Sequence, residues 1–224
     1  MRYITDALYK KMQLFHLPVD GDMTLADVEE LFGIEAEDFL LQELLARDDW
    51  YDTYLPEPLH SRLFDSNGEV SLRDLDDSLW QEILQYRQSI EQEWAQAAAQ
   101  AQEEKRKLMT AAPELGALVQ LDLRDSEIRS ISGIDSDEIQ IKLYPQWDLG
   151  KILILRFTDV KDSWMSRMHP DDANWWLADE IALDEERPGR YTLQVLFGNA
   201  DFVGQLQFSF AGVTIKERED PLEY

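Results

Sequence analysis

The chain has 224 residues, of which 44% are hydrophobic and 11% aromatic. This apolar content is sufficient for a sizeable core and excludes disorder over most of the chain. The chain carries 46 acidic and 21 basic residues, a formal net charge of −25 at pH 7. Because such a surface repels phosphates and anionic headgroups, we expect neither a nucleic-acid nor a membrane partner.

The absence of cysteine limits the chemistry available to this protein. It excludes disulfides, thiolate nucleophiles and zinc sites built on cysteine. The first residues contain no apolar leader segment, and no stretch approaches eighteen apolar residues. We therefore expect a soluble, cytoplasmic protein.

Residues 1–112 are predicted to form a helical region, because their apolar residues recur every three or four positions. Thr24 and Asp27 resemble a capping box that begins a helix, and Gly33 ends that helix. The same helical periodicity continues across residues 35–51.

One long helix is predicted at the end of this region. Ser71 and Asp74 indicate its start, and it would run to about residue 110, a length of about 60 Å. Beyond Trp94, residues 95–102 are rich in alanine and glutamine, which favour helix but offer little to bury. We expect this carboxyl-terminal half to be solvated or packed on a partner.

Residues 117–218 are predicted to form a second domain made of β-strands. Pro113 and Gly116 mark the boundary. From residues 121–124 onward, apolar and polar residues alternate, which is typical of antiparallel strands with one buried face. Residues 151–157 (KILILRF) are apolar on both faces and predict a central strand. Six or seven strands indicate an α+β protein with an antiparallel β-sandwich or open-barrel-like domain.

Residues 63–74 contain a partial match to a calcium-binding loop. With Gly68 at the sixth position, Asp65, Asn67 and Asp74 fall at the third, fifth and twelfth positions. The first position is a leucine, where such a loop requires aspartate. We therefore favour a turn followed by a helix cap, keep a calcium-binding module as an alternative, and predict no metal.

No residue is singled out as catalytic. Adjacent acidic residues are frequent, but a chain with 46 acids contains such pairs by composition alone. General acid–base chemistry requires a carboxylate whose pKa is raised by burial, which sequence cannot show. A carboxylate-based or metal-assisted hydrolase remains an alternative, and no cofactor is predicted.

Two adjacent tryptophans, Trp175 and Trp176, are the best candidates for a binding surface. Neighbouring residues of a strand point to opposite faces, so one indole can enter the core while the other faces a partner. Asp179 and Glu180 follow closely and would add charge to the rim. These four residues form the predicted partner-binding site.

Five segments carry a resemblance to a known family. They are residues 1–5 (MRYIT), 123–128 (LRDSEI), 156–160 (RFTDV), 175–181 (WWLADEI) and 191–197 (YTLQVLF).

In this order, these segments resemble a bacterial domain-of-unknown-function family with a helical amino-terminal half and a β-rich carboxyl-terminal half. Members tend to have a histidine before the aspartate equivalent to Asp125, whereas this chain has Arg124. The resemblance implies a fold arrangement and a bacterial cytoplasm, not a reaction. By analogy with acidic α+β immunity and regulatory proteins, we expect a non-enzymatic protein that binds a basic protein partner.

Overall fold

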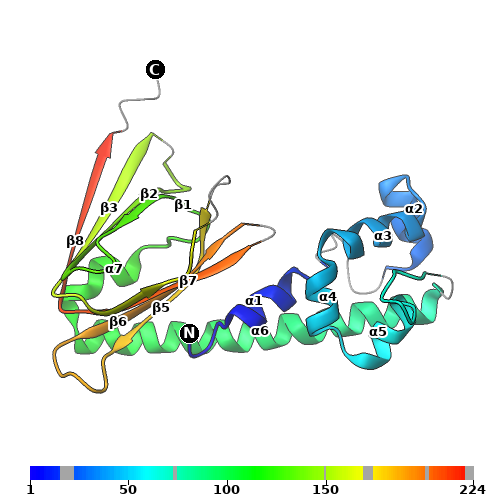
Figure 1. The fold of residues 1–224 in the computed structure, drawn as a ribbon, viewed down its shortest axis with the longest axis horizontal. Helices are drawn as coiled ribbons and strands as arrows, with labels where there is room; N and C mark the ends of the chain where they lie inside the picture. The colour runs from blue at the N-terminus through cyan, green and yellow to red at the C-terminus, as the bar shows by residue number, and fades with distance from the viewer. Residues whose placement is uncertain (16–22, 73–74, 149, 169–173, 200–201, 220–224) are drawn as a thin grey trace. The chain divides into compact units, whose positions relative to one another are not determined.

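The computed structural model describes residues 1–15, 23–72, 75–148, 150–168, 174–199 and 202–219. These residues form an α+β protein, with helices in the amino-terminal half and an antiparallel eight-stranded sheet in the carboxyl-terminal half (Figure 1). The fold class predicted from the sequence is therefore confirmed. Among the described helices, none combines the length and apolar character of a bilayer-spanning segment.

The longer helices occupy the first half of the chain. They are α1 (Asp6–Gln13), α2 (Leu25–Phe32), α3 (Ala36–Ala46), α4 (Asp48–Tyr54), α5 (Glu57–Leu63) and α6 (Asp77–Ala111).

Helix α2 has the predicted capping box. The Thr24 hydroxyl accepts a hydrogen bond from the Asp27 amide at 3.2 Å, and the Asp27 carboxylate accepts one from the Thr24 amide at 2.8 Å. Gly33 ends the helix in the left-handed region, with φ of 68°. Since glycine adopts this conformation without a Cβ clash, the predicted stop is also confirmed.

The helical character predicted across residues 35–51 is confirmed, but the chain breaks at Arg47 into two helices, α3 and α4. Arg47 has φ −146° and ψ 41°, outside helical geometry, and its carbonyl accepts the amides of Trp50 and Tyr51 to start α4. The break accompanies burial of Tyr51, whose hydroxyl accepts a hydrogen bond from the Phe15 amide at 2.8 Å. Tertiary packing thus overrides local helix propensity.

Helix α6 is the predicted long helix, but it begins at Asp77 and not near Ser71. The Asp76 carboxylate caps it by accepting a hydrogen bond from the Leu79 amide at 2.7 Å. The Ser71 amide instead donates to the Leu63 carbonyl at 2.8 Å. That bond closes a small turn in which Phe64 bridges Val70, and this pairing keeps Ser71 out of the helix.

The chain divides into two compact units, Ala7–Gln96 and a second unit that joins Met1–Asp6 to Ala97–Tyr224. The division lies within α6 and not at Pro113 or Gly116.

The carboxyl-terminal turns of α6 belong to the unit that contains the sheet. Ala97, Ala101 and Leu108 are each less than 9% exposed, and Leu108 is part of the core of the sheet. One face of the alanine-rich segment is therefore buried within its own unit, whereas Ala95, Gln96, Ala99, Gln100 and Gln102 are exposed. The expectation of a solvated half holds for the exposed face and is wrong for the buried one.

The sheet follows a short 3-10 turn, η1 (Pro113–Leu115), and helix α7 (Gly116–Gln120). Its strands are β1 (Glu127–Ser132), β2 (Glu138–Tyr144), β3 (Lys151–Thr158), β4 (Lys161–Met165), β5 (Asn174–Leu183), β6 (Tyr191–Gly198), β7 (Val203–Phe210) and β8 (Gly212–Glu219). The described strands are ordered β4-β7-β6-β5-β1-β2-β3-β8, which leaves the sheet open with β4 and β8 at its edges.

One strand prediction is wrong: residues 121–124 follow α7 as irregular chain. The KILILRF segment is β3, which lies between β2 and β8 and pairs with both, so it is an interior strand as predicted. Its Leu153, Leu155 and Phe157 are fully buried, whereas Ile152 and Ile154 are only half-buried.

The sheet curls so that strands distant in its order meet in one core. The Phe157 ring on β3 lies 4.8 Å from Phe208 and 5.0 Å from Phe210 on β7, although β6, β5, β1 and β2 separate the two strands. Asp159 and Val160 link β3 directly to β4, which pairs with β7 at the opposite end of the sheet. The curl therefore gives the open-barrel character predicted from the sequence.

Candidate functional site

The two predicted tryptophans of β5 have opposite environments. Trp175 is 39% exposed, whereas Trp176 is 1% exposed and belongs to the core. The Trp176 indole Nε1 donates a hydrogen bond to the Asp179 carboxylate at 3.0 Å. Asp179 also forms an ion pair with Lys105 of α6 at 2.8 Å. Both Trp176 and Asp179 therefore contribute to packing within the unit.

Glu180, the fourth predicted residue, is also largely buried. Its carboxylate accepts hydrogen bonds from the backbone amides of Arg2, Tyr3 and Ile4, at 2.6, 2.8 and 2.6 Å. A buried carboxylate needs such partners to offset its lost hydration. Since Trp176, Asp179 and Glu180 are engaged internally, the four residues do not share one open surface, and Trp175 is the one most available to a partner.

The predicted calcium loop has the hydrogen bonding of a turn. The Asp65 carboxylate accepts the amides of Asn67 at 2.7 Å and Glu69 at 3.1 Å, and Gly68 has φ of 78°. Asp74 lies outside the described residues. Within the described ranges, no three histidine or acidic side chains are grouped as metal ligands.

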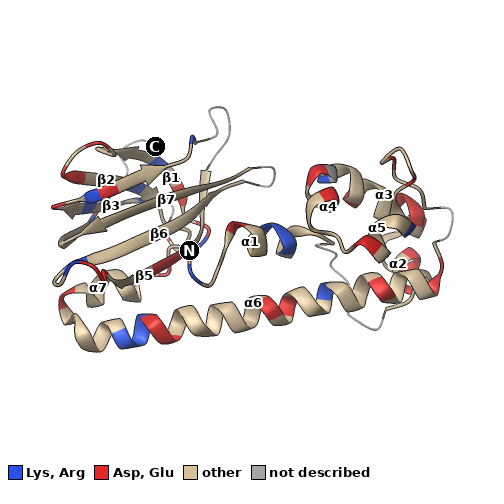
Figure 2. Cartoon of the chain, turned by 60° about the horizontal axis from the view of Figure 1, so that its bottom comes forward, with Lys and Arg blue, Asp and Glu red and all other residues tan. Residues whose placement is uncertain are grey.

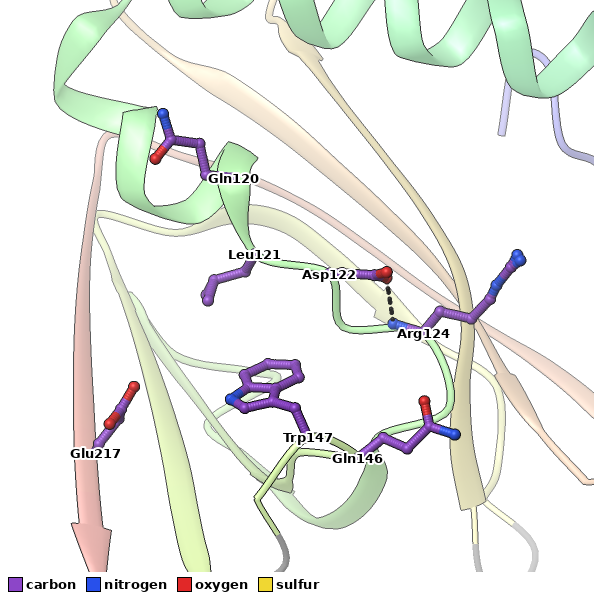
Figure 3. A pocket seen from close by; sticks show the side chains of 7 residues that line it. All are labelled: Gln120, Leu121, Asp122, Arg124, Gln146, Trp147 and Glu217. Atoms are coloured by element: carbon purple, nitrogen blue, oxygen red, sulfur yellow. Dashed lines mark hydrogen bonds between the residues drawn. The ribbon is translucent and has the colours of Figure 1, made fainter.

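A surface hollow that the sequence prediction missed lies around Trp147, in the turn between β2 and β3. It has a volume of about 640 Å³. The residues that line this feature, called here the Trp147 hollow, are Gln120, Leu121, Asp122, Arg124, Gln146, Trp147 and Glu217 (Figure 3).

Hydrogen bonds fix the turn that carries Trp147. The Asp148 amide donates to the Pro145 carbonyl at 3.3 Å, and Pro145 itself is buried. The Asp148 carboxylate accepts the Gly150 amide at 3.3 Å and pairs with Lys151 at 3.0 Å. The hydrogen bond from Lys151 lowers the pKa of Asp148. The turn is therefore held on both sides of Trp147, whose side chain is 52% exposed.

The hollow combines an aromatic face with carboxylates. Figure 3 shows the Trp147 indole beside Leu121, with Glu217 of β8 on one side and Asp122 on the other. The Asp122 carboxylate is oriented by the Arg124 amide, which donates to it at 3.2 Å. The guanidinium of Arg124 points away from the indole (Figure 3). An indole face flanked by carboxylates can bind an organic cation.

A local signal for this site exists in the sequence. Trp147 lies between Pro145 and Gly150, residues typical of turns. A large aromatic side chain in a turn is not part of the buried face of a strand, so it can be exposed. Gln146 is its neighbour in the chain, whereas the other lining residues come from α7, the chain after it, and β8. The proximity of Glu217 follows from the pairing of β3 with β8, which is not visible in the sequence.

Neither the protein-family models nor the curated proteins with which the sequence was compared match this chain. The resemblance to the bacterial family remains a prediction.

Proposed function

We propose that this chain is a non-enzymatic interaction protein of the cytoplasm, regulator-like or immunity-like, which uses its acidic surface to bind a basic protein. The observation that carries the proposal is an exposed tryptophan, Trp147, held at a hollow with carboxylates in a chain of net charge −25. Exposed aromatic side chains on a rigid support are typical anchors of protein interfaces.

The excess of acid extends over the whole chain. Residues 1–116 carry 25 acidic and 10 basic residues, and residues 117–224 carry 21 and 11. Acidic residues lie on helices of the amino-terminal unit and on the sheet-containing unit (Figure 2). Because acids outnumber bases by 25, one-to-one pairing cannot neutralise them. The resulting negative potential would accelerate encounter with a cationic protein.

The mechanism proposed is electrostatic steering followed by aromatic anchoring. Steering acts over roughly a Debye length, about 10 Å at 0.1 M salt, and weakens as salt is added. Trp147 and Trp175, both partly exposed in the sheet-containing unit, would then contribute the short-range contacts.

Affinity capture at low salt, followed by kinetics, tests this proposal. The full chain is used as bait in a bacterial cytoplasmic extract, and the retained proteins are identified and purified. We expect a basic protein whose association rate constant falls at least about tenfold between about 20 mM and about 500 mM salt. Capture of acidic or neutral proteins alone, or a rate constant independent of salt, would contradict the proposal.

A further inference from the structure

We infer that the Trp147 hollow accepts an arginine side chain of the basic partner, with the guanidinium stacked on the Trp147 indole and paired with Glu217 or Asp122. This inference rests on the proposed function and adds to it a specific contact and a specific residue type.

The first step concerns preorganisation. Trp147 is half-exposed, while hydrogen bonds on both sides hold the turn that carries it. The backbone from Pro145 to Asp148 is therefore held by its own hydrogen bond before a ligand stacks on the indole. Arginine can stack on an indole because its guanidinium is planar and less strongly hydrated than the ammonium of lysine.

The second step concerns charge inside the hollow. The two lining carboxylates, Asp122 and Glu217, lie on either side of the indole (Figure 3). Lys151 already pairs with one of these carboxylates and would compete with the guanidinium for it. Its Nζ lies 3.6 Å from the Glu217 carboxylate and 3.0 Å from that of Asp148. An incoming guanidinium can replace Lys151 at Glu217 while Lys151 keeps its shorter contact with Asp148.

The third step concerns geometry. Arginine offers five N–H donors in a flat fork, so one edge can pair with a carboxylate while the face remains on the indole. The Asp122 carboxylate is oriented by the Arg124 amide at 3.2 Å. The guanidinium of Arg124 itself points away from the indole and leaves that face to a guest (Figure 3).

Nuclear magnetic resonance of the tryptophan indole N–H groups tests the inference with the full chain. The Trp147 resonance is assigned by its loss in Trp147→Phe. The probe is the peptide acetyl-Gly-Arg-Gly-amide, and its counterpart with citrulline has nearly the same shape without the charge. We expect the arginine peptide to shift the Trp147 resonance and to bind at least about threefold more tightly than the citrulline peptide.

Three variants separate the site from general charge effects. Trp147→Leu should weaken binding of the arginine peptide, and so should the double replacement of Asp122→Asn with Glu217→Gln, which removes both lining carboxylates. Trp164→Leu, which changes an indole 55% exposed on the edge strand β4, should leave binding unchanged. Far-ultraviolet circular dichroism and thermal unfolding check that each variant is folded.

Several outcomes would overturn the inference. They are equal binding of the two peptides, and no shift of the Trp147 resonance at millimolar peptide. A third is a shift of that resonance by cellobiose, an uncharged sugar that can also stack on an indole, and not by the arginine peptide. If the captured basic partner associates in a salt-dependent manner but binds Trp147→Leu as tightly as the wild type, this inference fails and Trp147 is not an anchor, whereas electrostatic steering to a basic partner stands. If association does not depend on salt, the proposed function fails, whatever the peptide does.

Discussion

Glu180 and Ile4 are separated by 176 positions in the chain, yet the Glu180 carboxylate accepts a hydrogen bond from the Ile4 backbone amide at 2.6 Å. The same carboxylate accepts the amides of Arg2 and Tyr3. One buried acidic side chain on β5 thus satisfies three consecutive backbone donors and ties the amino terminus to the sheet-containing unit.

Glu180→Gln should destabilise this unit by about 1–3 kcal/mol, because the amide side chain offers one acceptor oxygen and loses the charge that strengthens these bonds. Urea unfolding measures the free-energy change. Amide hydrogen exchange should also accelerate at Tyr3 and Ile4. Glu185→Gln, in an exposed hairpin, is the matched control and should change neither quantity. Unchanged exchange at Tyr3 and Ile4 in Glu180→Gln would show that the carboxylate does not hold this segment.

Tyr191 and Glu114 should make stability depend on pH at both extremes. The Tyr191 hydroxyl donates to the Glu114 carboxylate, and this bond lowers the pKa of Glu114 and raises that of Tyr191 to about 12. The bond requires ionised Glu114 and neutral Tyr191. Its contribution is therefore complete between the ordinary values, about 4.3 for glutamate and about 10 for tyrosine.

Below that window the contribution is lost as the pH falls through the lowered pKa of Glu114. Above it, the contribution is lost as the pH rises through about 12, the raised pKa of Tyr191. Tyr191→Phe should lower the urea midpoint at pH 7, and its difference from wild type should shrink as the pH approaches 3. A difference that stays constant from pH 7 to pH 3 would exclude the linkage to Glu114.

Arg190 should be sensitive even to replacement by lysine. Its guanidinium donates to Ser209 Oγ at 3.1 Å and to the Asp159 carboxylate at 2.7 Å, and its side chain is only 12% exposed. Lysine keeps the charge but cannot reproduce the fork, so Arg190→Lys should cost about 1–3 kcal/mol in urea unfolding. Arg156→Lys is the control, because the Arg156 side chain is 53% exposed and should tolerate the change. If the two variants were equally stable, the planar donor geometry of the Arg190 guanidinium would not contribute to stability.

Two glycines with nearly the same backbone angle should respond differently to alanine. Gly133 has φ of 83° and Gly189 has φ of 80°. A Cβ on Gly133 would lie 2.0 Å from the Glu138 carbonyl oxygen, whereas one on Gly189 would have no atom within 4 Å.

Gly189→Ala should therefore cost about 1–2 kcal/mol, the strain of the left-handed conformation alone. Gly133→Ala adds a backbone clash and should cost about 1–3 kcal/mol more. Thermal and urea unfolding of both variants compare the two costs. Equal losses would show that the turn at Gly133 can relax around the added methyl group.

Local signals predicted much of the fold. The Thr24 capping box, the stop at Gly33 and the existence of the long helix were predictable, because each depends on residues within one or two helical turns. The antiparallel strands were predictable from the alternation of apolar and polar residues, because this pattern indicates a strand with one buried face. The break at Arg47 was not, because no local breaker marks it and burial of Tyr51 accompanies it.

The environments of the candidate site residues were harder to predict, because they too depend on tertiary packing. Trp175 and Trp176 are equivalent in sequence, and the register of β5 decides which indole enters the core. In the sequence Glu180 is one acidic residue among many, and only its contacts with the amino terminus in the tertiary structure distinguish it. Trp147 lies in a recognisable turn, but the residues that make its hollow come from segments up to 97 positions apart, from Gln120 to Glu217.

The sequence by itself determined the acidic charge, the absence of cysteine chemistry and the division into helical and stranded halves. These follow from composition and from short-range periodicity, which act over a few residues. Only the tertiary structure decided that one face of the alanine-rich turns of α6 is buried within their unit, that Glu180 holds the amino terminus, and that Trp147 stands exposed beside two carboxylates. Burial and charge pairing depend on which distant segments meet, and patterns that act over a few residues do not record those meetings.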